Sequence, residues 1–307
     1  MAPLFASQIA AMVVLAAAAA TIHFRGKVRL RFVRQLTDYS TFTAPFNVFV
    51  YLCSAVPNRP MLDAARFPKL DLLREHWETI RDEARALYEA GHIGKSDRHD
   101  DVYGNSLFKK GWRRFYLKWY GDALPSARRH CPETVALLER IPGLHAAMFT
   151  LVAPRSRLGR HRDPFATSLR YHLGLITPNS DRCRIFIDGE PYAWRDGEGV
   201  LFDETYVHWV ENDTDAPRII LFCDVERPLH GRIPTMINRF VARRLAPHSA
   251  GRNVESEHLG ALNRIVEWTY PIHLAGRRLK KRHRTVYYTL KFGLLGAALG
   301  AFLLAGR

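Results

Sequence analysis

The sequence has few cysteines and lacks several motifs that would identify a chemistry directly. Its four cysteines are far apart and form no C-x-x-C pair, which excludes a zinc ribbon and a thioredoxin-like centre. No G-x-x-x-x-G-K-[ST] or H-E-x-x-H motif occurs, and a lone G-x-G lacks its third glycine. Phosphate-binding loops, zinc-protease helices and dinucleotide-binding folds are therefore unsupported. Cysteines without pairing motifs fit a reducing compartment.

Acidic residues are missing from the two most basic stretches of the chain. The 307 residues carry a formal net charge of +15. Residues 23–34 hold five basic side chains and residues 277–284 hold six, with no acid in either stretch. Charge gathered near the two ends disfavours a nucleic-acid binder and favours contact with an anionic membrane surface.

Each basic stretch borders an apolar segment. Residues 3–22 contain no charged residue and are long enough to cross a bilayer as a helix. No Lys or Arg precedes this segment, which disfavours a cleaved signal peptide. A second, shorter apolar run covers residues 292–306, and its extension back to residue 285 gives a candidate helix over 285–306, either transmembrane or interfacial. The positive-inside rule places both basic stretches, and the chain between them, in the cytoplasm.

The middle of the chain changes from helical to β-rich patterning. Apolar residues spaced by three and four predict a helix over residues 69–90. A strand is expected within residues 106–122, where Phe115, Leu117 and Trp119 alternate with polar or amphipathic neighbours, and a short helix over 134–140. From 147 to 225, short β-rich runs follow one another without intervening helices, and Asp188-Gly189 signals a hairpin. This pattern predicts a β-sandwich or jelly roll, followed by helices over 235–245 and 258–270.

His161 and Asp163 form the most informative short motif. Residues i and i+2 of a strand face the same side, so this pair can chelate one metal ion, and Pro164 should end the strand close by. His208 lies in a later β-rich run and could supply a third ligand. Two histidines and one carboxylate leave open coordination positions, as in non-haem Fe(II) oxygenases.

Alternatives remain for each of these residues. A second H-x-D pair, at His99 and Asp101, lies in a polar stretch and is interpreted as loop or capping chemistry. His208 could be a core histidine among aromatic residues. Arg218, ten residues beyond it, could be a surface charge at a strand end, but a buried arginine there would suit a dicarboxylate ligand.

Longer segments carry a resemblance to a known family. The segments R-H-R-D-P-F, S-L-R-Y-H-L-G-L-I-T-P-N, D-G-E-G-V-L-F-D-E-T-Y-V-H and R-I-I-L-F-C-D-V-E-R-P resemble the aspartyl/asparaginyl β-hydroxylases. Within that family, the chain is similar to the membrane-bound lipid A 2-hydroxylases of bacteria over residues 20–230. The resemblance implies a double-stranded β-helix (jelly roll) fold and a 2-oxoglutarate-dependent Fe(II) dioxygenase.

The resemblance also implies roles for particular residues. His161 and His208 would bind Fe(II), and Asp163 completes the triad where animal members of the family have a glycine. Arg218 and Thr150 would contact the distal carboxylate of 2-oxoglutarate, whereas Arg170 and His172 would lie near its proximal end. The implied reaction uses O2 to hydroxylate C2 of a secondary acyl chain of lipid A. Alternatives are another membrane lipid such as an ornithine lipid, a peptidyl Asp or Asn, or a membrane-anchored basic binding module without catalysis.

These observations predict five segments and no obligate protein partner or nucleic-acid ligand. The segments are a transmembrane helix over 1–22, a basic juxtamembrane stretch over 23–35, a catalytic jelly-roll domain with an N-terminal helical part over 36–230, a basic membrane-proximal helical region over 231–284, and the candidate helix over 285–306. The expected location is the bacterial inner membrane, with the catalytic domain in the cytoplasm.

Overall fold

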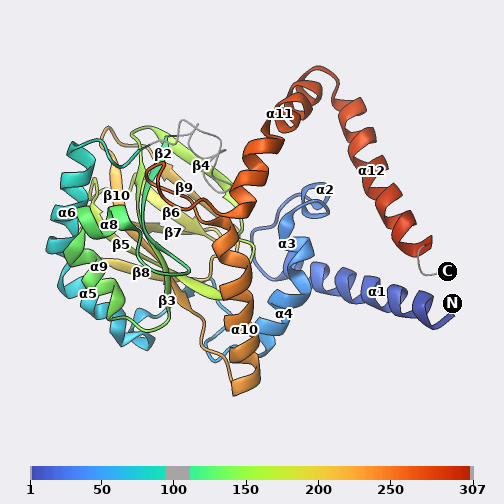
Figure 1. Cartoon of the computed structure of the whole chain (residues 1–307), viewed down its shortest axis with the longest axis horizontal. Coiled ribbons are helices and arrows are strands. Elements are labelled where there is room, and N and C mark those ends of the chain that lie inside the picture. The colour runs from blue at the N-terminus through green and yellow to red at the C-terminus, as the bar shows by residue number, and fades with distance from the viewer. Residues whose placement is uncertain (1, 95–110, 305–307) are drawn as a thin grey trace.

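Two antiparallel sheets packed face to face form the centre of the protein. The computed structural model describes residues 2–94 and 111–304 (Figure 1). The larger sheet has the order β1-β8-β5-β10-β3-β2 and the smaller one the order β4-β9-β6-β7. The strands are β1 Met61–Leu62, β2 Trp112–Trp119, β3 Leu144–Val152, β4 Ser156–His161, β5 Ser168–Ile176, β6 Cys183–Ile187, β7 Glu190–Ala193, β8 Gly199–Phe202, β9 His208–Asn212 and β10 Arg218–Glu226.

The strand order is that of a jelly roll. From β3 to β10, four strands lie in each sheet, and the chain passes from one sheet to the other at most connections. Every strand pair is antiparallel. Eight strands shared in this way between two facing sheets form a double-stranded β-helix, so the predicted fold of this domain is confirmed.

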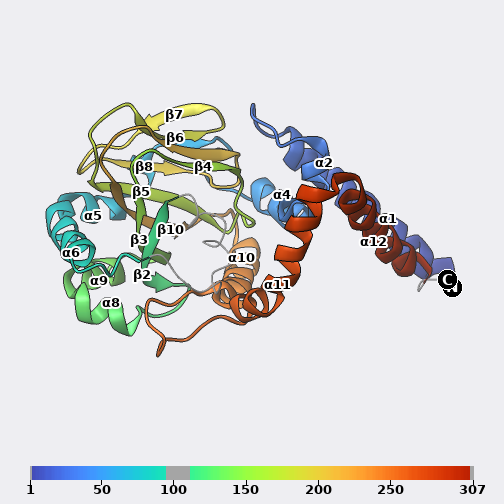
Figure 2. The same cartoon turned by 90° about the horizontal axis from the view of Figure 1, so that it is seen from above.

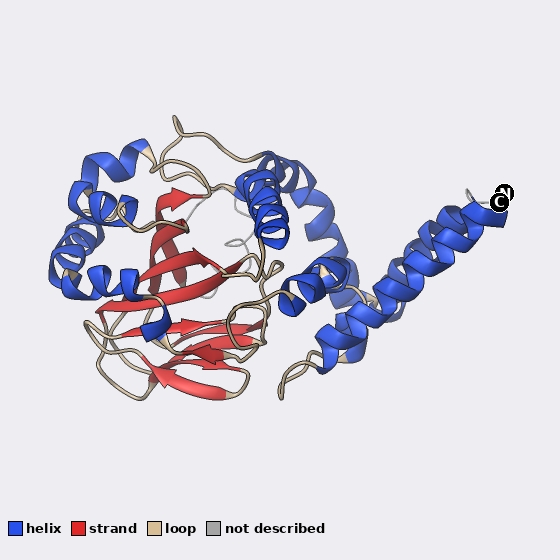
Figure 3. Ribbon diagram, turned by 90° about the horizontal axis from the view of Figure 1, so that it is seen from below, coloured by secondary structure: helices blue, strands red, loops and turns tan. Residues whose placement is uncertain are grey.

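Most helices lie outside the sheets, as Figure 3 shows. The helix predicted over 69–90 is interrupted at His76, whose backbone leaves the helical region (φ −107°, ψ 22°). The helix predicted to end at residue 270 continues through Pro271, which removes one helical hydrogen bond without ending the helix. The α-helices are α1 Ala2–Phe24, α2 Phe32–Gln35, α3 Tyr39–Phe42, α4 Ala44–Leu52, α5 Asp71–Glu75, α6 Trp77–Glu89, α8 Pro125–His130, α9 Pro132–Glu139, α10 Arg232–Leu245, α11 Ala261–Arg282 and α12 Arg284–Leu304.

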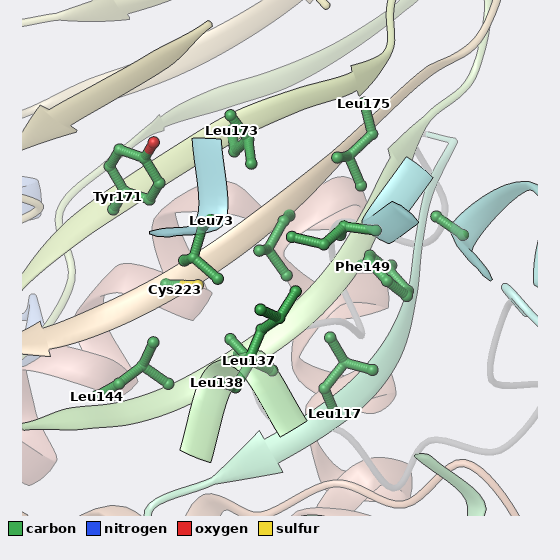
Figure 4. Close-up of a cluster of buried hydrophobic side chains, with 14 of the residues drawn as sticks. Leu73, Leu117, Leu137, Leu138, Leu144, Phe149, Tyr171, Leu173, Leu175 and Cys223 are labelled. Atoms are coloured by element: carbon green, nitrogen blue, oxygen red, sulfur yellow. The ribbon is translucent and has the colours of Figure 1, made fainter. Parts of the chain in front are cut away.

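The larger sheet buries apolar side chains on both faces. One face packs against α5, α6, α8 and α9 through residues such as Leu73, Leu138 and Phe149 (Figure 4). The other face packs against the smaller sheet through residues such as Met148 and Ile185. The helices therefore cover one face of the larger sheet, and the smaller sheet covers the other.

The alternation predicted for β2 fails at Trp119. Phe115 and Leu117 point to the helical side, as expected, whereas Trp119 packs between the sheets. The pairing of β2 with β3 shifts between Tyr116 and Lys118. A β-bulge inserts one extra residue and reverses the side on which the following residues lie.

The predicted hairpin at Asp188-Gly189 is confirmed, because both residues have positive φ between the paired strands β6 and β7.

Of the helices in the described part of the chain, one is long and apolar enough to cross a membrane, over residues Ala6–Phe24. Residues 284–304 fold as α12, but no second membrane-spanning helix is shown there. The N and C ends lie close together, away from the sheets, in each view of the whole chain (Figures 1, 2 and 3).

A buried ion pair joins the end of α1 to the jelly roll. The Arg25 guanidinium lies 2.6 Å from Asp203 Oδ2 and donates to Thr205 Oγ1 at 2.7 Å. It also stacks over the ring of Tyr51, 3.7 Å from its centroid. Asp203 is fully buried and pairs with Arg227 as well. The apolar helix is therefore fixed to the domain by contacts that exclude solvent.

Replacing Arg25 should destabilise the fold. We expect Arg25→Ala to lower the free energy of unfolding by about 3 kcal/mol, because it removes one partner of a buried ion pair. Denaturant unfolding of the full chain in detergent micelles measures the change. Lys27→Ala is the matched control, since the ion pair of Lys27 with Glu190 is exposed and should contribute little. An equal loss in both variants would contradict the inference.

Candidate metal and oxoacid site

Two histidines from neighbouring strands face each other between the sheets. Strand β4 pairs with β9 in a register that sets His161 opposite His208, with ring centroids 4.3 Å apart. In each ring, Nδ1 lies within hydrogen-bond distance of a backbone carbonyl, Gly159 O at 2.8 Å and Tyr206 O at 3.0 Å. Donation from Nδ1 fixes the tautomer of each ring. The lone pair of Nε2 is then available to a metal ion.

Asp163 joins the two histidines from a loop and not from the strand itself. Strand β4 ends at His161, two residues earlier than the motif predicted. The Asp163 amide donates to Glu204 O at 3.0 Å. Asn47 of α4 holds the loop beyond it, donating to Pro164 O at 2.9 Å and accepting from the Ala166 amide at 2.9 Å. Single ligand atoms of His161, Asp163 and His208 lie within 4.8 Å of one another, close enough to share one ion.

The local charges keep these ligands in the forms that bind metals. Burial opposes ionisation of Asp163, but the charge of Arg170, the two histidines and the hydrogen bond from Arg170 together outweigh it and lower the pKa of this carboxyl to about 2. Burial and the adjacent His161 lower the pKa of His208 to about 3. An ionised carboxylate and a neutral imidazole are therefore present at neutral pH, as a metal ion requires.

Arg170 contacts three carboxylates. Its guanidinium pairs with Asp163 and with Glu204, and it lies 2.9 Å from Asp224 Oδ1. One arginine cannot neutralise three ionised acids, and burial raises the pKa of Glu204 well above its usual value. This shift favours the protonated form of Glu204, which reduces the negative charge of the cluster. The role expected for Arg170 at the proximal end of 2-oxoglutarate stays a prediction, because in the structure this side chain holds Asp163.

Arg218 is a buried cation with no carboxylate partner among the described residues. It begins β10, is 2% exposed, donates to Thr150 Oγ1 at 3.2 Å and stacks over Trp194. Its Nε has no hydrogen-bond acceptor in the described part of the chain. Burial lowers the pKa of Arg218 to about 10. An incompletely satisfied buried guanidinium beside a hydroxyl fits one carboxylate of a dicarboxylate ligand.

His172 is a second buried polar group with unsatisfied atoms on the same inner face. It lies beside Trp194 and Phe222, and neither ring nitrogen has a hydrogen-bond partner within residues 2–94 and 111–304. Burial lowers the pKa of His172 well below its usual value, so the ring is neutral. Its neighbour on β5, Arg170, faces the same way, as the alternation of a strand predicts. The unsatisfied atoms of His172 and Arg218 fit a polar ligand such as 2-oxoglutarate between them.

All seven residues singled out from the sequence line one cavity of about 620 Å³. They are Thr150, His161, Asp163, Arg170, His172, His208 and Arg218. Sequence reasoning missed Glu204, Asp224 and Asn47. Asp224 pairs directly with Arg170 across β10 and β5, a relation that only the register reveals. The other H-x-D pair, His99 and Asp101, lies outside the described residues.

Comparison with known proteins shows the family of the chain. The family model for aspartyl/asparaginyl β-hydroxylases matches residues 74–228. The chain belongs to this family. It is 34% identical over 175 residues to the ornithine lipid ester-linked acyl 2-hydroxylase of Rhizobium tropici, covering 56% of this chain and 62% of that protein. It is 30% identical over 162 residues to human aspartyl/asparaginyl beta-hydroxylase, covering 51% of this chain and 21% of that protein.

The chain therefore spans less than two thirds of the length of these relatives. Among solved structures, a prolyl-4-hydroxylase of Pseudomonas putida overlaps 52% of this chain and 87% of its own, with 20% identity and a TM-score of 0.35.

We expect the three ligand residues to bind one divalent ion jointly. Calorimetric titration of the protein with Fe(II) or Mn(II) under nitrogen should give one binding site per chain. His208→Gln and Asp163→Asn should each weaken binding by about a hundredfold or more, since even residues that only orient metal ligands contribute 10- to 100-fold. His99→Ala removes a histidine of the other H-x-D pair and should leave the affinity unchanged. Equal affinity in all four proteins would exclude the site.

Arg218 should determine the affinity for the oxoacid. We expect Arg218→Ala to weaken binding of 2-oxoglutarate to the metal-loaded protein by about a hundredfold, because it removes a buried charge-assisted pair. Equilibrium dialysis with labelled 2-oxoglutarate measures this. Arg157→Ala is the control, because that arginine is exposed and pairs with Asp213. A similarly small change in the affinity for 2-oxoglutarate in both variants would show that Arg218 does not belong to the binding site.

Proposed function

We propose that the protein is an Fe(II)/2-oxoglutarate-dependent dioxygenase that hydroxylates C2 of a secondary fatty-acyl chain of lipid A. The proposed location is the cytoplasmic face of the bacterial inner membrane. The observation that supports this most strongly is the pairing, in one cavity, of an open three-ligand cluster with the buried cation Arg218, which has no carboxylate partner among the described residues. A structural metal site would need neither open positions nor a second, separate anion site.

The protein residues position the reactants. His161, Asp163 and His208 would hold the iron on one side. Arg218, with Thr150, would hold the far carboxylate of 2-oxoglutarate. When bound, the iron supplies the oxidation, in which O2 and 2-oxoglutarate convert a C–H to C–OH and yield succinate and CO2. Arg170 would keep Asp163 ionised and fixed in orientation.

An acyl chain suits the remainder of the cavity. Beyond the polar groups, apolar side chains line it, including Leu158, Ile185 and Val210. The candidate membrane span, α1, is fixed to the domain through Arg25. The similarity to a 2-hydroxylase of an ester-linked acyl chain supports hydroxylation at C2 of a lipid.

Two other substrates belong to the same chemistry. The relative from Rhizobium tropici acts, by its name, on an ornithine lipid, so an ornithine lipid is the second candidate. A peptidyl Asp or Asn is less favoured, because the resemblance implies a glycine, in place of Asp163, in animal members of the family.

Turnover without a lipid tests the type of enzyme. Purified protein with Fe(II), 2-oxoglutarate and O2 should release succinate slowly, and Asp163→Ala should reduce the rate by more than about tenfold, because a metal ligand is lost. Succinate measured by mass spectrometry is the readout. Arg157→Ala should keep the wild-type rate. Succinate release by Asp163→Ala at the wild-type rate would contradict the ligand assignment.

Lipid mass spectrometry tests the substrate. Cells that express the protein should contain lipid A with one additional oxygen on a secondary acyl chain, and cells that express His208→Gln should lack it. Ornithine lipids from the same cells provide the second measurement. Added oxygen on ornithine lipids alone would reject lipid A and select the second candidate.

A further inference from the structure

Helix α10 has one face toward the active-site cavity and another toward the outside. On the inner face, Asn238 is buried and donates to Thr167 O at 3.0 Å. Val241 and Ala242 line the cavity that contains the metal ligands. The helix is therefore part of the wall around the cavity and not a separate appendage.

The outer face of α10 exposes a row of large apolar side chains. They recur at intervals of three and four residues: Ile233 (67% exposed), Met236 (65%), Ile237 (37%) and Phe240 (59%). This spacing places all four on one stripe of a helix. Isolated exposed apolar residues are ordinary, but a contiguous stripe of this kind marks a surface that contacts another apolar phase.

Positive charge accompanies the stripe. Arg232, Arg243 and Arg244 have no ion-pair partner among the described residues, whereas Arg239 pairs with Glu226. The four arginines, with Met236 and Phe240, line a groove on the outer side of the helix. A helix with arginines beside an apolar stripe fits the interface of an anionic membrane, where phosphates meet the guanidinium groups and acyl chains meet the stripe.

The position of α10 agrees with such an interface. It lies on the side of the sheets that faces α1 and runs crosswise to α1 (Figures 1 and 2). If α1 crosses a bilayer, α10 runs parallel to the surface of that bilayer, because it is crosswise to α1. A second element with exposed apolar residues, such as Phe32 and Phe42, is the α2–α3 segment. Arg34, Tyr39 and Thr43, in and next to the same segment, line the active-site cavity.

We infer that α10 docks the catalytic domain on an anionic lipid leaflet through its apolar stripe and its arginines. Helix α10 and the α2–α3 segment then border an opening through which an acyl chain reaches the metal site from the leaflet. The docking stands on α10 alone. The passage of an acyl chain rests on the proposed function.

Spin labelling of the full chain in vesicles tests the docking. The label is placed by Met236→Cys in a Cys53→Ser background, since the other three cysteines are buried. Glu78→Cys on α6, at the far side of the sheets, is the control (Figure 1). In vesicles of phosphatidylethanolamine and phosphatidylglycerol, the label at position 236 should collide readily with O2 and be shielded from a water-soluble nickel chelate. The label at position 78 should show the opposite pattern.

Other outcomes of the labelling overturn the docking. Equal access of the nickel chelate to positions 236 and 78 would show that α10 lies in water. Shielding of position 236 from O2 and chelate alike, together with disulfide cross-linking between copies at that position, would show that a second copy of the chain covers the stripe. Replacing phosphatidylglycerol by phosphatidylcholine should raise access of the chelate to position 236. If the access of the chelate did not change, the arginines would have no role in the docking.

Hydroxylation on two forms of the same lipid tests the route. In Met236→Glu/Phe240→Glu, hydroxylation of lipid in vesicles, relative to the same lipid dispersed in detergent, should fall about tenfold, because charged side chains oppose interfacial insertion. Tyr88→Glu, an exposed aromatic position on α6, is the matched control. An unchanged ratio would reject the entry route. If the wild type hydroxylates neither form, the proposed substrate fails, while the labelling still decides the docking.

Discussion

The candidate site depends on one register, the pairing of β4 with β9 that sets His161 opposite His208. In an antiparallel sheet, a slip of one residue would turn either imidazole to the outer side. The register is supported by residues of the inner face, where Leu158 pairs with Val210 and both pack between the sheets. A shift in pairing follows between Leu158 and His161, so the strand is already irregular where it delivers its ligand.

Charge balance sets the second constraint. Around Arg170, three acids are buried together, and Arg218 is buried with no acid beside it in the part of the chain that the structure describes. Burying unequal charge costs free energy unless protons or ligands compensate for it. Near Arg170, the raised pKa of Glu204 favours its neutral form, and a metal cation would offset the remaining negative charge. Near Arg218, an anion would balance the positive charge. The two departures from local neutrality have opposite sign and lie in one cavity, which is how a site for a cation and a dicarboxylate would be arranged.

The sequence indicated which residues meet in the cavity better than it indicated their surroundings. His161, Asp163 and His208 were recognisable because ligand types recur at short spacing in β-rich segments. Arg218 stood out because a basic residue begins an otherwise apolar strand. Asp224 and Glu204 carried no such signal, since their roles arise from cross-strand and loop contacts with Arg170. Asn47 lies 119 residues from Ala166, which its side chain binds. The bulge in β2, which turned Trp119 inward, likewise depends on pairing with β3.

The loop between β8 and β9 connects the end of α1 to the candidate metal site. Asp203 receives Arg25 from the end of α1, and the next residue, Glu204, accepts the backbone hydrogen bond of Asp163. On the other side, Asn47 of α4 holds the chain just after Asp163, and α4 packs against α1. Both connections are buried, so neither is weakened by solvent or salt as an exposed pair would be. The position of the cavity relative to α1 is therefore set by the same contacts that place Asp163, and a lipid held by the bilayer would meet the site at a fixed depth.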